Sequence, residues 1–249
     1  MSEAIRVTPL GCGRIRAPAR FMERDGEGEL DFPVWAFLIQ HPTGGLALFD
    51  TGMHPADHGR VVSAHYHFHA PPAETIAGQL ALHGIAPEAM RTVVISHIHS
   101  DHCGGVELLP NARLVVNRAE AAHAEAHSPT WRYFDHGHDR LLLDGDHDLF
   151  GDGSVEVLAT PGHTCGHQSL RIRRFGRADV LAGDACYFCR SLERDEFDQP
   201  SAVDPDQYLA TKRRLMAMRA AGDFVVPGHD EFLDQAPADS WIVRPVPSR

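Results

Sequence analysis

The side chains best suited to chemistry are concentrated in residues 96–105, which read S-H-I-H-S-D-H-C-G-G. This segment follows an apolar run rich in Val and Ile, which is typical of a buried strand. Residues two apart in an extended chain point to the same side, so the pattern predicts that His97, His99 and Asp101 converge while His102 faces away. Burying so much polarity without a partner is costly. We therefore expect this segment to bind metal, with alternate residues serving adjacent ions.

Three further polar residues occupy the same setting, each beside a glycine at the end of an apolar run. They are His163 after residues 155–158, Asp184 after 180–182 and His229 after 224–226. Enzymes with α/β folds commonly build their sites from loops at strand ends, and imidazole and carboxylate suit first-row dications. The sequence therefore predicts that these loops meet at one sheet edge and complete a metal site.

The composition limits the class of protein. The chain has 249 residues, of which 43% are apolar, enough to bury a sizeable core in one domain over residues 1–249. It carries 23 basic and 34 acidic residues, and the net charge of −11 argues against a nucleic-acid partner. No apolar run approaches the roughly 20 residues of a membrane span, and the start lacks a secretory signal pattern. We expect a cytoplasmic protein without a membrane partner.

The five cysteines are irregularly spaced, which does not indicate a disulfide framework. Cys186 and Cys189 form a C-x-x-C pair, but neither a thioredoxin-like context nor a second pair accompanies them. Reduced thiols fit the same compartment, and the role of this pair stays open.

Strand-like runs alternate with helical stretches, which predicts an α/β fold. Strands are expected at residues 5–10, 34–40, 46–50, 92–96, 113–116, 155–159, 169–172, 179–182 and 223–226. Helices are expected at about 74–83, 117–126 and 205–221. Glycine-containing breaks at 42–45 and 151–153 are typical of hairpin turns. Hairpins combined with crossovers predict mixed β-sheets.

The succession H-x-H-x-D-H, G-H, G-D and P-G-H, preceded by D-T-G at residues 50–52, resembles the metallo-β-lactamase-fold hydrolases. The resemblance implies a four-layer αββα sandwich with two divalent metal ions at one edge of its sheets. It also implies the ligands: His97, His99 and His163 for one ion, Asp101, His102 and His229 for the other, and Asp184 as the bridge. Asp50 would support the loop that carries the histidines. Zinc is the expected metal, and iron, cobalt and manganese share its ligand preferences.

Within this superfamily, two features resemble the N-acyl homoserine lactonase branch. Tyr187 lies three residues after Asp184, where that branch has a tyrosine that contacts the substrate carbonyl, and residues 32–42 followed by 50–52 are similar to its opening. The resemblance implies a hydrolase that opens a small-molecule lactone by attack of a hydroxide bridging the metals. Asp101 would shuttle a proton to the leaving alkoxide. A glyoxalase II-like thioesterase, another ester hydrolase and a metal-dependent oxidoreductase remain alternatives.

The remaining histidine clusters are interpreted as loop or lid residues, because no strand-like run and no carboxylate accompany them. They are His65, His67 and His69, and His136 and His138. His167 is expected to support a ligand or the fold. Residues 20–22 are expected to form a mobile apolar lip over the site.

Two groups of aromatic side chains are candidates for surface exposure. Phe68 and residues 131–134 could form a lid or the contact of a homodimer.

Overall fold

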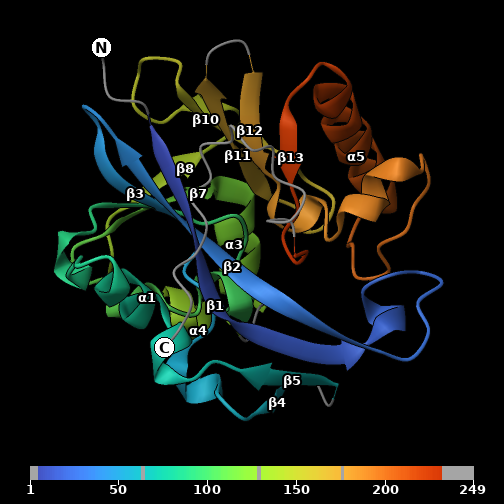
Figure 1. Ribbon diagram of the computed structural model, residues 1–249, viewed down its shortest axis with the longest axis horizontal. Helices are drawn as coiled ribbons and strands as arrows, with labels where there is room; N and C mark the ends of the chain where they lie inside the picture. Colours follow the sequence, from blue (N-terminus) through green and yellow to red (C-terminus); the bar gives the residue numbers. More distant parts are fainter. Residues whose placement is uncertain (1–4, 63–64, 128–129, 175–176, 232–249) are drawn as a thin grey trace.

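Two mixed β-sheets pack face to face, and helices cover both outer faces (Figure 1). The computed structural model describes residues 5–62, 65–127, 130–174 and 177–231. This four-layer αββα arrangement is the fold class that the sequence predicts.

The first sheet has eight strands in the order β4-β5-β1-β2-β3-β6-β7-β8. Its strands are β1 (Arg6–Pro18), β2 (Glu29–His41), β3 (Gly45–Phe49), β4 (Val61–Val62), β5 (Tyr66–His69), β6 (Thr92–Val94), β7 (Arg113–Asn117) and β8 (Arg140–Leu143). Pairing is antiparallel from β1 to β3 and parallel from β3 to β8. The predicted turn at residues 42–45 joins β2 to β3 in a hairpin.

The second sheet has five strands in the order β13-β12-β11-β10-β9. They are β9 (His147–Asp148), β10 (Val155–Ala159), β11 (Gln168–Arg174), β12 (Arg177–Leu181) and β13 (Phe224–Val226). All neighbours pair antiparallel except β12 and β13, which are parallel. The predicted turn at residues 151–153 connects β9 to β10.

The helices divide between the two outer faces. Those on the side of the first sheet are α1 (Ile76–Leu82), α2 (Ser100–Cys103), α3 (Arg118–His127) and α4 (Trp131–Phe134). The longest helix, α5 (Pro205–Ala220), covers the second sheet beside β13 (Figure 1). The Asp204 side chain accepts a hydrogen bond from the Gln207 backbone N–H and so caps the N-terminus of α5. Pro205 is the first residue of the helix, where the sequence predicts that it begins.

Strand β2 demonstrates why the sandwich has two apolar layers. Alternate residues of a strand point to opposite faces. Trp35, Phe37 and Ile39 therefore pack between the sheets, whereas Leu38 and its neighbours on the other side pack under the helices. Because both faces are covered, this strand reads as an unbroken apolar run rather than an alternating one.

The carboxyl ends of five strands converge on one edge of the sandwich. Parallel pairing aligns the ends of β3 and β6 in one sheet and those of β12 and β13 in the other. The residues that follow these ends, together with the end of β10, are Asp50, His97, His163, Asp184 and His229. The fold thus brings the predicted loops together.

Strands β1 and β2 are longer than expected and form an arm with β4 and β5 (Figure 1). A register shift between Gly11 and Arg14 lets β1 continue past the predicted end at residue 10. Gly13 has a φ of 104°, and a Cβ there would lie 2.4 Å from the carbonyl oxygen of His69, so glycine is required for the close approach of β5. The prediction of a loop at residues 66–69 is therefore wrong.

Three of the four aromatic side chains expected at the surface are buried, and the fourth, Trp131, is partly buried. Phe134 is 0% exposed, Phe68 5% and Tyr133 9%. Phe68, Tyr133 and Phe134 belong to the apolar layer between the first sheet and the helices that cover it. The Arg140 guanidinium lies over the Phe134 ring. Because these three side chains are buried, they are not available as a lid or as the contact surface of a dimer. The homodimer stays a prediction without this support.

We predict that Phe134→Ala lowers the free energy of unfolding by about 3–5 kcal/mol, the usual cost of emptying a buried phenylalanine site. Leu82→Ala is the matched control because Leu82 is 44% exposed, and it should change stability by less than about 1 kcal/mol. Urea unfolding measures both variants. Equal midpoints for the two variants would contradict the burial of Phe134.

Candidate metal centre

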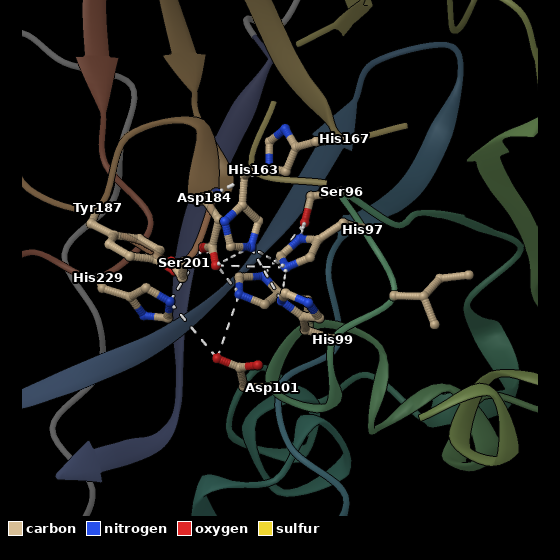
Figure 2. A network of polar contacts seen from close by, with 12 residues as sticks. Ser96, His97, His99, Asp101, His163, His167, Asp184, Tyr187, Ser201 and His229 are labelled. Carbon is tan, nitrogen blue, oxygen red and sulfur yellow. Dashed lines mark hydrogen bonds and ion pairs between the residues drawn. The ribbon is translucent and has the colours of Figure 1, made fainter. Parts of the chain in front are cut away.

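Three imidazole nitrogens form a small triangle at the converging strand ends. His97 Nε2 lies 2.8 Å from His99 Nδ1 and 3.2 Å from His163 Nε2, and the third edge is 3.1 Å (Figure 2). The Oδ2 atom of Asp184 lies 3.3 Å from His163 Nε2 and 3.6 Å from His97 Nε2. These four atoms surround one common point.

A second set of donors lies on the other side of Asp184. Its Oδ1 atom is 3.1 Å from His102 Nε2 and 3.2 Å from His229 Nε2. Asp101 Oδ2 completes this set at 3.6 and 3.7 Å from the same two nitrogens. The single Asp184 carboxylate therefore turns one oxygen to each set, as a bridging ligand does.

The position of Asp101 corrects the expectation drawn from residue spacing. The chain is extended at His99 but becomes helical at Ser100, the first residue of α2. Asp101 consequently groups with His102 and His229 rather than with His97 and His99. The alternation of an extended chain does not apply across that boundary.

The donor atoms fit two first-row dications. Imidazole nitrogens bound at about 2.0–2.1 Å in a tetrahedron stand about 3.3 Å apart, close to the spacing seen here. Within the described part of the chain, His102 Nε2 and Asp184 Oδ1 are buried and make no hydrogen bond. Buried polar atoms rarely lack a partner. Ions bound between them would account for their mutual orientation.

The electrostatics favour the protonation states that metal binding requires at three ligands and oppose them at two. Burial lowers the pKa values of His97 and His163 well below the ordinary value, so both rings are neutral. Burial opposes ionisation of Asp184, but the surrounding imidazoles, led by His102 and His229, outweigh it and lower its pKa. Neutral histidine and ionised carboxylate are the forms that bind metal.

Burial alone would lower the pKa values of His102 and His229, but the carboxylates of Asp184 and Asp101 outweigh it and raise them, so a metal ion must displace a proton there.

Asp50 fixes the loop that carries the first four ligands. Its carboxylate accepts hydrogen bonds from Ser96 N at 2.7 Å, Ser96 Oγ at 2.8 Å and His102 Nδ1 at 2.9 Å. With Nδ1 engaged, His102 presents Nε2 to the second donor set. Among the described residues other than glycine, Asp50 alone has a positive φ, 62°, a strained conformation of the kind found at functional sites. Asp50 thus has the contacts expected of a supporting residue.

His167 acts on the bridging residue and not as a ligand. Its Nε2 accepts a hydrogen bond from the Asp184 backbone N–H at 3.0 Å, and Nδ1 lies 2.9 Å from Thr160 Oγ. Burial lowers the pKa of His167 to about 3, so the ring stays neutral and can accept this bond. It holds the turn that carries Asp184.

Gln199 is a site residue that the sequence reasoning missed. Its amide nitrogen lies 2.7 Å from His163 Nδ1 and donates to the Asp184 carbonyl at 3.1 Å, so one side chain contacts two candidate ligands. The adjacent Asp198 pairs with the buried Lys212 of α5 at 2.9 Å, which anchors this loop. No motif marks Gln199, because its position follows only from how α5 packs.

Tyr187 lies beside both donor sets. Its ring centroid is 5.3 Å from that of His229 and 5.7 Å from that of His163, and its hydroxyl is 2.9 Å from Ser201 Oγ (Figure 2). Burial raises the pKa of Tyr187 well above its usual value. The hydroxyl keeps its proton and is available as a hydrogen-bond donor.

The donor sets open into a cavity of about 440 Å³. One end is polar and includes His99, Asp101, Tyr187 and Ser201. The other wall is apolar and is built by the arm and by Met22, which belongs to the lip expected at residues 20–22. On β5, Tyr66 and Phe68 line the cavity, whereas His67 and His69 are exposed. His67 and His69 therefore do not face the donor sets.

The C-x-x-C pair does not have the features of a redox site. Both thiols are free, and Cys186 is buried. Burial, with the nearby Asp230, raises the pKa of Cys189 to about 12. A reactive cysteine needs a lowered pKa, so this environment favours a structural role.

The αββα fold and the two His/Asp donor sets at one sheet edge define the class of metallo-hydrolases, and the comparisons agree. The metallo-β-lactamase superfamily model matches residues 30–229, and the chain belongs to this superfamily. The chain is 31% identical over 248 residues to the N-acyl homoserine lactonase AttM of Rhizobium radiobacter, covering 91% of this chain and 93% of that one.

Two more relatives agree with this assignment. The chain is 31% identical to the N-acyl homoserine lactonase of a Bacillus species, with 81% of this chain and 82% of that one covered. A solved quorum-quenching N-acyl homoserine lactone hydrolase aligns with a TM-score of 0.82 at 25% identity, covering 94% of this chain and 96% of that one. The predicted family and the prediction of a hydrolase enzyme are confirmed.

Among the described residues, no helix is both long and apolar enough to cross a membrane.

We predict that the two donor sets lose metal separately. His229→Ala should retain the ion of the His97, His99 and His163 set and lose the other, which lowers the metal content from two ions per chain to about one. His163→Ala should have the reverse effect. Elemental analysis after dialysis measures the content, and His83→Ala, outside the donor sets, is the control that keeps two. Wild-type protein with fewer than two ions per chain would contradict the paired arrangement.

Proposed function

We propose that this enzyme hydrolyses the ester bond of a lactone, with N-acyl homoserine lactones as the substrate class. The observation that carries the proposal is a single cavity that joins two metal-binding donor sets to a buried tyrosine hydroxyl and an apolar wall. The relatives named as N-acyl homoserine lactonases support the substrate class.

The seven ligand-type residues would hold two divalent ions, for which we propose zinc. When bound, such ions lower the pKa of a shared water towards about 7 and polarise the carbonyl of the ester. His97, His99 and His163 would orient one ion and Asp101, His102 and His229 the other, with Asp184 fixing the distance between them. Asp50 and His167 keep these ligands in place through the hydrogen bonds described above.

Tyr187 would bind the carbonyl oxygen of the ester. Its hydroxyl is protonated, borders the cavity and is held by Ser201. For the Tyr187 hydroxyl to donate to the substrate, Ser201 must donate its own proton to the tyrosine oxygen. A donor fixed in advance stabilises the oxyanion that develops as the carbonyl is attacked.

Asp101 would deliver the proton that the leaving alkoxide needs. Its side chain is 15% exposed, against 3% for Asp184. Both carboxylates line the cavity, but Asp101 is the more exposed and would exchange protons with it, whereas histidines surround Asp184. Asp184 would hold the two donor sets together, and Asp101 would both bind its ion and transfer the proton.

The apolar wall would receive the acyl chain. Ile15, Phe32 and Phe68 present a continuous apolar surface next to the polar end, and burying each methylene of a chain contributes about 0.8 kcal/mol.

A cytoplasmic location would suit such a substrate, and both this location and the homodimer stay predictions.

The decisive experiment measures acid release from a panel of N-acyl homoserine lactones, with thioesters, phosphodiesters and simple aryl esters alongside. We expect turnover of the lactones, its loss with a chelator and its return with zinc. Preference for a thioester would favour a glyoxalase II-like reaction instead. No lactone turnover at millimolar substrate would overturn the proposed function.

We predict that Asp101→Asn lowers kcat by about 10²–10⁴-fold, the usual contribution of a general acid. The comparison is made on protein shown by elemental analysis to hold both ions, so that metal loss is not the cause. Glu125→Gln removes a carboxylate from the exposed side of α3 and should leave kcat unchanged. A decrease smaller than about tenfold would rule out proton delivery by Asp101.

A further inference from the structure

The apolar wall of the cavity is a patch of side chains contributed by four strands. Ile15 on β1 pairs with Phe32 on β2 and with Phe68 on β5, and Val62 on β4 pairs with Tyr66 on β5. All five side chains line the cavity. Strand register therefore puts them side by side on one face, and four of the five are purely apolar.

Tyr66 is the only one of these five side chains that carries a hydroxyl group. The Phe21 ring packs at a centroid distance of 6.1 Å from the Tyr66 ring, so the ring belongs to the wall. The Tyr66 hydroxyl has no hydrogen bond to any other residue that the structure describes. A hydroxyl in an apolar wall lowers the affinity for a plain hydrocarbon chain unless a ligand pairs with it.

Tyr66 lines the same cavity as the candidate ligands Asp101 and Asp184 and as Tyr187. Burial raises the pKa of the Tyr66 phenol, and the carboxylates of Asp101 and Asp184 raise it further. Tyr66 also adds to the shift of Tyr187. The phenol thus stays protonated, and the charges that act on it are those of the carboxylates at the polar end of the cavity.

The substrate class of the proposed function has a polar group at the corresponding point. In an N-acyl homoserine lactone, the amide is attached to the ring carbon next to the ester carbonyl, and the acyl chain begins beyond it. With the ester carbonyl at Tyr187 and the chain against Phe68, the amide falls between them. A phenol can donate to the amide carbonyl or accept from its N–H.

We propose that the Tyr66 hydroxyl pairs with the amide of the substrate and makes the cavity select amide-bearing lactones over plain alkyl lactones. This inference rests on the proposed lactonase function. Tyr66 determines specificity and takes no part in bond cleavage. A site that provides a hydrogen bond to its substrate discriminates against analogues that lack the partner group.

The test compares Tyr66→Phe with wild type on two lactones of equal chain length, an N-acyl homoserine lactone and a γ-alkyl lactone. We expect kcat/KM for the acylated lactone to decrease about tenfold, the effect of one neutral hydrogen bond. For the alkyl lactone it should change less than twofold or increase. Val62→Ala, which shortens the same wall without removing a hydroxyl, should lower both values in parallel.

Further readouts separate specificity from structure. Metal content and melting temperature of the Tyr66→Phe variant should equal those of wild type, and Tyr66→Leu is measured beside it as a second way of removing the hydroxyl. Equal changes for both lactones, or no change for either, would overturn the role of Tyr66 and leave the lactonase function standing. If wild type hydrolyses neither lactone, the proposed function itself fails, and the inference fails with it.

Discussion

The carboxylate of Asp184 is the interaction on which the site depends. It is buried, and its two oxygens face two different sets of nitrogens at 3.1–3.6 Å. An ionised group enclosed in protein costs several kcal/mol unless opposite charge compensates it. The histidines supply part of that compensation and bound ions would supply the rest. The two sheets meet around this carboxylate, since its partners come from both.

Much of the surrounding structure keeps that carboxylate in place. Gly183, in the turn before Asp184, has a φ of 54°, and a Cβ there would lie 3.0 Å from His167 Nε2. Glycine is therefore favoured at this position over any residue with a side chain. The nearby imidazoles are oriented in turn. His229 donates its Nδ1 proton to the Pro33 carbonyl at 2.9 Å, and His102 donates to Asp50. Each therefore presents Nε2 to Asp184. The neutral His167 completes the support from the backbone side.

The sequence predicted the ligand-type residues well because they occur at ends of strands with strong apolar signals. It failed where tertiary packing decides. The helical turn at Ser100 moved Asp101 to the second donor set, and nothing in residue spacing indicates where an extended segment ends. Residues 66–69 look polar because every second side chain faces solvent, yet their inward partners build the cavity wall. Gln199 has no local signal, since its contact with His163 arises only when α5 anchors its loop.

The arm formed by β1, β2, β4 and β5 has an evolutionary consequence. It supplies the wall that would contact the variable part of a substrate, while the candidate metal ligands come from loops at other strand ends. Substitutions among the side chains of this wall would therefore alter which molecules are accepted without replacing any of the seven ligand-type residues. Such a division of the site lets enzymes of common descent differ in the substrates that they accept while they keep the same reaction.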